Sequence, residues 1–211
     1  MLSPTAILIT ILGTIMVGAM SPGPSFVMVS RISISRSRMD GLAAAIGIGL
    51  GGTIFATLAL AGVTALITQF IWFYVALKVF GGAYLIYIAT QMWLGASHPI
   101  TATGAAEQST VGRSFGVAVL TQLSNPKAIV VYASVFAAVL PPSIPPSLFI
   151  ALPVGIFLVE TSWYVIVALI FSSSKPQSIY LSAKRWIDRA AAGLLGALGL
   201  RLVYSAVYNR A

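Results

Sequence analysis

Charged residues and cysteine are what this sequence of 211 residues lacks most. Only 8% of its residues are charged and 58% are hydrophobic, whereas an ordinary soluble domain has about 25% charged residues. So few charges cannot cover the surface of a soluble fold, and we therefore expect an all-α integral membrane protein. The length suits one bundle of about six helices, at roughly 20 residues per span.

The scarcity of reactive side chains excludes several kinds of chemistry. There is no cysteine, which rules out disulfides, thiolate zinc sites and thiol redox reactions. Four acidic residues and one histidine leave almost no set of side chains for a membrane enzyme or a metal exporter. We therefore expect a protein that is not an enzyme and that holds no metal or cofactor. The net charge of +8 comes from Lys and Arg clustered between apolar runs, which indicates cytoplasmic loop ends rather than nucleic-acid binding.

Six apolar runs predict six membrane helices, at about 5–29, 41–67, 71–94, 114–140, 147–172 and 187–208. The polar stretch 95–112, which contains His98, is expected to be a soluble loop between two halves, 1–94 and 113–211, of a single transporter domain. A basic loop, with Lys175, Lys184 and Arg185, is expected before the last helix. Since basic residues follow the first, third and fifth helices, the positive-inside rule places these loops in the cytoplasm and both termini outside.

Two of the predicted helices are interrupted by proline. Ser21-Pro22-Gly23-Pro24 breaks the first, and Asn125-Pro126-Lys127 breaks the fourth. Each proline removes a backbone donor and clashes with the preceding turn. In hydrocarbon, irregular backbone is tolerated only where it is buried in protein or lines a polar cavity. We therefore predict that all residues of the two breaks bind a small solute where the breaks meet.

The two breaks occupy corresponding places in the two halves. Because three helices precede the loop and three follow it, homologous halves would form an inverted repeat. The segments Gly82–Ala89 and Gly199–Ala206 also share Gly, Leu, Tyr and Ala at matching positions. Paired broken helices in inverted halves are typical of secondary transporters, whose half-helix ends bind a solute near the membrane midplane.

These motifs resemble the LysE/RhtB family of amino-acid exporters. Besides the two breaks, the resemblance rests on Gly41–Gly51, on Leu77-Lys78 with Gly81–Tyr87, and on Gly193–Gly199. It covers nearly the whole chain in order. The resemblance implies efflux of amino acids or close derivatives across a bacterial inner membrane, driven by the proton motive force. Many relatives carry an acidic residue right after the glycine of the second helix, where this chain has Gly52.

Glu160 and Lys127 are the main charged candidates for the site. Glu160 is the only carboxylate clearly inside a predicted span, and ionisable groups at membrane depth are usually functional. It could carry a proton or bind a substrate ammonium, and we hypothesise that it replaces the acid absent at Gly52. The structural alternative is an ion pair with Lys78 or Lys127. The Lys127 ammonium could itself meet a substrate carboxylate, or it could bind freed backbone carbonyls or reach the membrane surface.

Several other residues are secondary or structural candidates. Lys78 and Arg201 could reach towards the membrane surface, and Asp40 is expected to cap a helix more often than to bind a ligand. Gly47 and Gly51 belong to a row of small residues that allows close helix packing and would permit a homodimer.

Tryptophans near the predicted helix ends are expected in the aromatic belts of the membrane. Trp163 has a second interpretation. It lies close to Glu160 in the sequence and could instead face the cavity, together with Tyr164.

The expected function is proton-coupled export of an amino acid by a protein embedded in the lipid bilayer. A single intramembrane carboxylate and several cations favour a neutral or zwitterionic substrate over lysine or arginine. Two alternatives stay open: a passive channel, and an exporter of another small zwitterionic metabolite. A channel would show flux without saturation and without dependence on the proton gradient.

Overall fold

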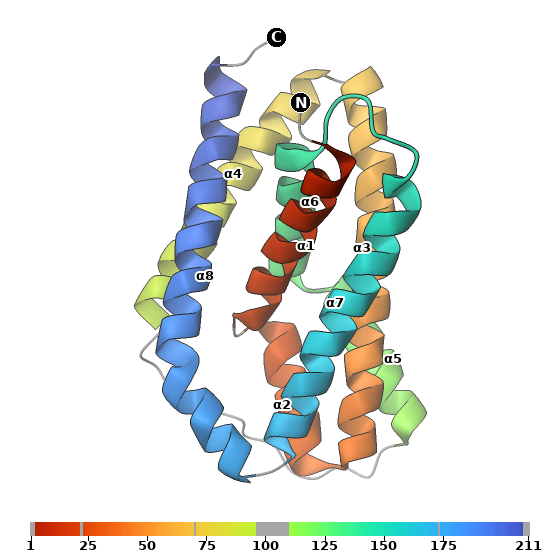
Figure 1. Cartoon of the computed structure of the whole chain (residues 1–211), viewed down its shortest axis with the longest axis vertical. Coiled ribbons are helices and arrows are strands. Elements are labelled where there is room, and N and C mark those ends of the chain that lie inside the picture. Colours follow the sequence, from red (N-terminus) through yellow and green to blue (C-terminus); the bar gives the residue numbers. More distant parts are fainter. Residues whose placement is uncertain (1–2, 22, 70, 96–109, 173, 209–211) are drawn as a thin grey trace.

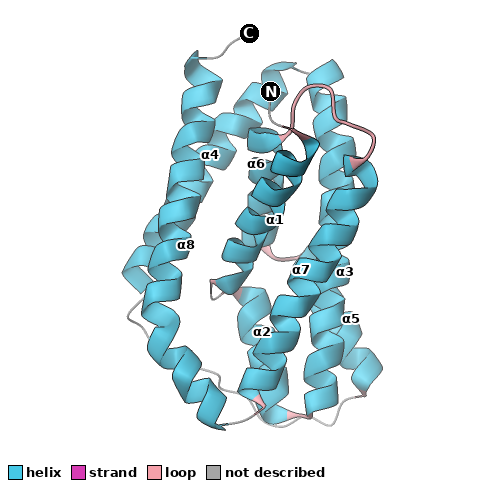
Figure 2. Ribbon diagram, viewed as in Figure 1, coloured by secondary structure: helices cyan, strands magenta, loops and turns pink. Residues whose placement is uncertain are grey.

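The computed structural model describes residues 3–21, 23–69, 71–95, 110–172 and 174–208. These residues form helices and connecting turns without a strand (Figure 2). In chain order the helices are α1 (Pro4–Met20), α2 (Pro24–Ser35), α3 (Arg38–Gln69), α4 (Ile71–Gly95), α5 (Val111–Leu123), α6 (Pro126–Val139), α7 (Leu148–Phe171) and α8 (Ser174–Tyr208). Pro22 and most of the expected connecting loop, with His98, lie outside the described residues.

The helices are those of a membrane protein. Among the described residues, Arg38–Gly62 in α3, Leu148–Phe171 in α7 and Asp188–Val207 in α8 are long and apolar enough to cross a membrane. The bent pair of α1 and α2 makes a fourth span if it is counted as one. The expectation of an all-helical membrane protein is therefore confirmed at this level.

The first and fourth predicted helices are each divided at the predicted break. α1 and α2 meet at an angle of 56°, and α5 ends at Leu123 just before α6 begins at Pro126. Gly23 and Asn125 are the N-cap residues of α2 and α6, and a proline follows each. Proline suits the first position of a helix because the N–H it lacks would have no partner within the helix.

The start of the last helix differs from the expectation. α8 begins at Ser174, so the segment with Lys175, Lys184 and Arg185, which we expected to be a loop before a helix starting near 187, is helical. Lys and Arg favour helix almost as well as Leu, and Pro176 falls in the first turn, where proline is tolerated. The basic composition of this segment therefore does not mark the end of a helix.

The helices divide the bundle into two levels, which Figure 1 shows. α1 and α6 lie in contact in the upper half, and α2 and α5 lie in contact in the lower half. α3 packs against α7, and α4 packs against α8. α1 begins and α8 ends at the same upper end of the molecule (Figure 1). Both helix breaks consequently lie at about mid-height.

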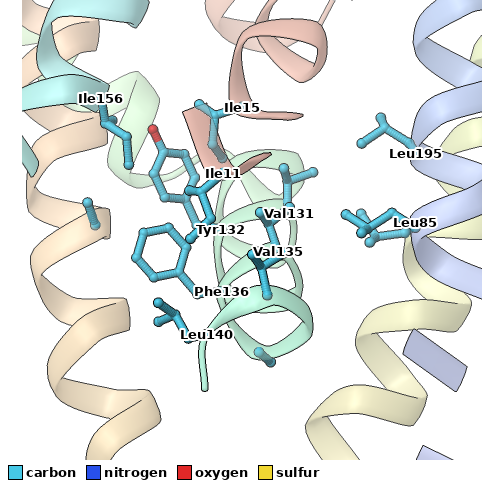
Figure 3. Packing of buried hydrophobic residues seen from close by; sticks show 14 of the residues in the cluster. Ile11, Ile15, Leu85, Val131, Tyr132, Val135, Phe136, Leu140, Ile156 and Leu195 are labelled. Carbon is cyan, nitrogen blue, oxygen red and sulfur yellow. The ribbon is translucent and has the colours of Figure 1, made fainter. Parts of the chain in front are cut away.

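Two apolar clusters lie on either side of this middle level. The larger surrounds α6, where Tyr132 and Phe136 pack with Ile11 of α1 and Ile156 of α7 (Figure 3). The smaller joins α2 to α7, and in it the rings of Phe26 and Phe171 meet edge to face at 5.7 Å.

Along α7, residues 148–156 belong to the first cluster and residues 163–171 to the second, with the buried Glu160 between them. The polar residues of the breaks therefore lie between two apolar layers.

The contact between α4 and α8 depends on two glycines. A β-carbon added at Gly82 would lie 2.8 Å from Gly199 O, and one added at Gly199 would lie 2.7 Å from Gly82 O. We expect Gly199→Val to force the helices apart and to destabilise the protein by about 1–3 kcal/mol, as overpacking does. The measurement is the thermal unfolding midpoint of the detergent-purified protein.

Gly193→Val is the matched control, because Gly193 lies on the same helix with no atom within 4 Å of an added β-carbon. Equal losses in the two variants would show that the glycine contact does not hold α4 to α8.

Candidate functional site

A small cavity lies where the two broken helices cross. α1, α2, α5, α6 and α7 contribute to its wall. Its polar lining consists of Ser21, Gly23, Ser25, Gln122, Asn125, Lys127, Tyr132, Glu160 and Tyr164. The cavity volume is about 30 Å³, which is room for about one or two water molecules.

The N-termini of α2 and α6 both lie at this cavity. Asn125 caps α6, since its Oδ1 accepts from Lys127 N at 3.0 Å and from Ala128 N at 3.4 Å. α2 begins after Gly23 with no side-chain cap. The backbone amides and the helix dipole make a helix N-terminus attractive to anions. Two such ends at one cavity suit a carboxylate.

The C-terminal end of α1 is held by donors from two other helices. Lys127 Nζ of α6 donates to Gly18 O at 3.2 Å and to Ser21 O at 3.3 Å. Trp163 Nε1 of α7 donates to Ala19 O at 3.0 Å. These are carbonyls that the end of α1 leaves without a partner in the helix.

Lys127 therefore binds freed backbone carbonyls, which is one of the three roles considered for it above. Its side chain passes close to Gly23, where an added β-carbon would lie 3.3 Å from Lys127 Cδ. Asp188 of α8 attracts the Lys127 ammonium electrostatically.

A chain of hydrogen bonds joins both breaks to Glu160. Asn125 Nδ2 donates to Ser25 Oγ at 3.0 Å, and Ser25 Oγ donates to Gln122 Oε1 at 2.6 Å. Gln122 Nε2 then donates to both carboxylate oxygens of Glu160, at 3.2 and 3.1 Å. The residues come from α6, α2, α5 and α7, so four helices meet in one network.

Glu160 is 3% exposed and packs against α3 at Gly52. A β-carbon added at Gly52 would collide with Glu160 Oε2 and would lie 2.7 Å from Tyr132 Oη. The carboxylate therefore occupies the space beside the residue where we expected an acid to be missing. The Lys127 ammonium is used by the carbonyls of α1, and Lys78 does not line the cavity, so neither lysine supports the ion pair considered above.

Pro24 and Pro126 lie on the outer side of the breaks. We expected Pro24 and Pro126 to bind substrate, but both are exposed and line a separate open groove together with Ser124 and Asn125. A proline at the first position of a helix has no N–H to offer a ligand. The inner wall is formed by the neighbouring Ser21, Gly23 and Lys127.

Asp40 binds protein groups away from the cavity. Its carboxylate accepts from Ser37 Oγ and, at 2.7 Å, from Ser114 Oγ. Arg36 Nη1 also donates to Ser114 Oγ, at 3.1 Å. Ser37 Oγ in turn accepts from Asp40 N, so Ser37 is the cap and Asp40 ties the start of α3 to the start of α5.

The remaining candidates lie outside the site. Added β-carbons at Gly47 and Gly51 would meet α5, at Ala118 and at Gln122, so both glycines allow close packing of α3 on α5. Arg201 is exposed on α8.

Three residues of the site were missed at the sequence level. Ser25, Gln122 and Tyr132 line the cavity. The hydrogen-bond partners of Ser25 and Gln122 lie on other helices, far away in the sequence. A glutamine in an apolar run just before the second break was the available signal, because an unpaired buried amide is costly. Trp163, expected first in an aromatic belt, instead binds α1.

The fold and the site define a helical membrane protein with a polar, charged cavity enclosed by broken helices. The family model described as LysE type translocator matches residues 16–206. The chain therefore belongs to the LysE-type translocator family, whose members are transporters and not enzymes.

Named relatives support this membership over nearly the whole chain. A threonine efflux protein of Salmonella typhi is 35% identical over 90% of this chain and 93% of its own length. The threonine efflux protein of Escherichia coli K12 is 34% identical over the same shares. A leucine efflux protein of Salmonella choleraesuis is 28% identical over 88% of this chain and 89% of its own. No solved structure matches the chain.

The cap at the second break predicts a measurable loss of stability. Asn125→Ala removes the acceptor of two α6 amides and the donor to Ser25. We expect a loss of about 2 kcal/mol, at the upper end of the range for caps, because the freed groups are buried. The measurement is thermal unfolding of the purified protein.

Thr110→Ala is the control, because it removes an exposed cap that binds one amide of α5. We expect a loss of about 0.5–1 kcal/mol there. A smaller loss for Asn125→Ala than for this control would contradict the assigned role.

Proposed function

We propose that this protein exports a small neutral or zwitterionic amino acid, with threonine as the first candidate, across a bacterial inner membrane, and that the proton motive force drives export. The observation that supports this proposal is the cavity where the two broken helices cross. It combines one ammonium, one carboxylate and the N-termini of two helices. A zwitterion has the complementary pair of charged ends.

The cavity suggests how each end of the substrate would be bound. The start of α2, which has no side-chain cap, and the helix dipole of α6, whose first amides Asn125 already binds, would attract the carboxylate. Glu160 would take the ammonium. The buried Ser21 hydroxyl lines the cavity and has no hydrogen-bond partner among the described residues, so it is available to a polar substrate. The ammonium of Lys127 disfavours a cationic side chain such as that of lysine or arginine.

Threonine is the first candidate because the two relatives named as threonine efflux proteins resemble this chain more than the leucine efflux protein does, at 35% and 34% against 28% identity. A threonine side chain carries a hydroxyl that could use the polar wall of the cavity. Glycine or serine would fit the same argument less closely, since neither adds a methyl group against the apolar residues Ile15 and Val131.

Export would proceed by alternating access between two inverted halves. The pairing of α1 with α6 and of α2 with α5 supports such a pseudo-symmetry. The contact between Gly82 and Gly199 supports it too, because these are the first residues of the two similar segments, Gly82–Ala89 and Gly199–Ala206. Because the cavity admits about two water molecules at most, an amino acid would enter only after helices separate. The basic Arg31, Arg36 and Arg38 near the lower end favour a cytoplasmic position for that end.

Glu160 is the proposed proton carrier. Its carboxylate lies near the middle of α7, a helix long and apolar enough to cross a membrane, beside the bare backbone of Gly52 and the Tyr132 hydroxyl. A proton and a substrate ammonium would compete for the same oxygens, and competition of that kind couples their movements in opposite directions.

The test is a tolerance panel in a bacterial host sensitive to amino acids. Expression of the wild type should allow growth at inhibitory threonine concentrations, and Glu160→Gln at equal membrane abundance should lose at least 90% of the efflux rate, because its amide cannot ionise. The measurement is efflux of labelled threonine from preloaded cells. Arg201→Gln, which also removes a charge but from an exposed position, should behave as the wild type.

Normal efflux by Glu160→Gln would remove Glu160 from the mechanism, and no protection by the wild type against any amino acid would contradict the exporter itself. A passive channel is distinguished in proteoliposomes. An exporter shows a rate that saturates with substrate and rises with an imposed proton gradient, whereas a channel shows neither.

A further inference from the structure

We propose that Gln122 is a positioning residue that holds the Glu160 carboxylate and passes its protonation state to both helix breaks. This inference rests on the proposed role of Glu160 in export. It names Gln122 as the residue that connects Glu160 to the broken helices, which must move during transport.

The direction of the hydrogen-bond chain is set at the α6 cap. Asn125 Oδ1 is occupied by the amides of Lys127 and Ala128, so the other end of this side chain must donate, and it donates to Ser25. Ser25 then turns its own hydrogen to Gln122 Oε1. Gln122 is left with its Nε2 facing Glu160. Every link therefore donates in the direction of the carboxylate, and Gln122 Nε2 is the donor that reaches it.

The surface of α3 leaves room for both side chains. A β-carbon added at Gly51 would lie 2.7 Å from Cβ and Cγ of Gln122, and one at Gly52 would collide with Glu160 Oε2. Two consecutive glycines thus provide a flat strip of backbone against which the amide and the carboxylate lie together. Gln122 is 2% exposed, so an apolar residue in its place would not gain water as a substitute partner for Glu160.

No other charged group competes for this position within the wall of the cavity. Tyr132 of α6 and Tyr164 of α7 are the other titratable side chains near the carboxylate. The Lys127 ammonium lines the same cavity but donates to the end of α1, and Asp188 of α8 acts on Lys127. The ionisable residues near α2 and α3 lie away from the starts of α2 and α6 that meet at the cavity: Arg31 lies in the second half of α2, Arg36 follows its end, and Arg38 and Asp40 lie in the first turn of α3. The described part of α1 carries none.

Protonation of Glu160 would reverse the links. A neutral carboxyl presents an O–H, and the Gln122 amide can accept it only by turning its oxygen away from Ser25. Ser25 Oγ would then accept from both Asn125 Nδ2 and Gln122 Nε2, and its own buried O–H would lose its acceptor, which weakens the tie between α2 and α5. The expected consequence is that α2 separates from α5 more readily when Glu160 is protonated, whereas an ionised Glu160 keeps the two helices together.

The experiment is an infrared titration of the purified protein in lipid. The carbonyl band of a protonated carboxylic acid is assigned to Glu160 by its loss in Glu160→Gln, and its amplitude is followed against pH. Gln122→Met, which keeps the length of the side chain and removes its donor, should move the midpoint by about one pH unit or more to higher pH, because hydrogen bonds to an ionised group favour that form. Gln91→Met, at an exposed position of α4, should leave the midpoint unchanged.

Measurements of threonine efflux by the same variants provide an independent test. Gln122→Met should shift the pH profile of threonine efflux in the same direction, and in a Glu160→Gln background it should cause no further loss, because the two residues act as one unit. If Gln122→Met does not accumulate in the membrane, Ser25→Ala tests the next link and should give a smaller shift of the same sign.

An unchanged infrared midpoint in Gln122→Met, or in Ser25→Ala if that variant replaces it, would overturn the inference. A lower rate at every pH without a shift would do the same, since it would assign Gln122 to packing alone. If the wild type moves no amino acid while the infrared midpoint shifts as expected, the proposed function fails and the link between Gln122 and Glu160 stands.

Discussion

The end of α1 can exist in a membrane only because two other helices supply donors to it. Lys127 and Trp163 bind three carbonyls that the break exposes, and a buried carbonyl without a partner would cost about 1–3 kcal/mol. Hydrocarbon offers no water to replace these donors. α1, α6 and α7 must therefore assemble together, and the position of the cavity follows from that assembly.

Because Lys127 binds backbone, the two charged groups of the site have separate partners. The ammonium is bound to backbone, so the carboxylate of Glu160 is held by an amide and not by a cation. A hydrogen bond from a side-chain amide is weaker than a buried ion pair, and the carboxylate can exchange it for a bond from another donor. Within the proposed function, that leaves Glu160 responsive to a proton or an ammonium while the helix break stays intact.

Sequence reasoning located the breaks but not the bonds that connect them. Proline and glycine act locally, so Pro24 and Pro126 marked the starts of α2 and α6 correctly. Gln122 and Trp163 act across the bundle, and a single sequence carries no record of which distant group each one meets. The early start of α8 differs from the expected loop at Lys175 because basic residues between apolar runs are typical of membrane-facing loops but are also good helix formers.

The pairing of α4 with α8 also bears on how the protein is made. α4 ends at Gly95 and its partner begins only at Ser174, so the ribosome completes most of the chain before the two can meet. During that interval the glycine face of α4 around Gly82 lacks the backbone of Gly199, which packs on it in the finished fold. Tight packing of small residues develops only against another helix. The packing of α4 can therefore be completed only after the last helix is made, and a chain that stops short of α8 would leave the glycine face of α4 uncovered.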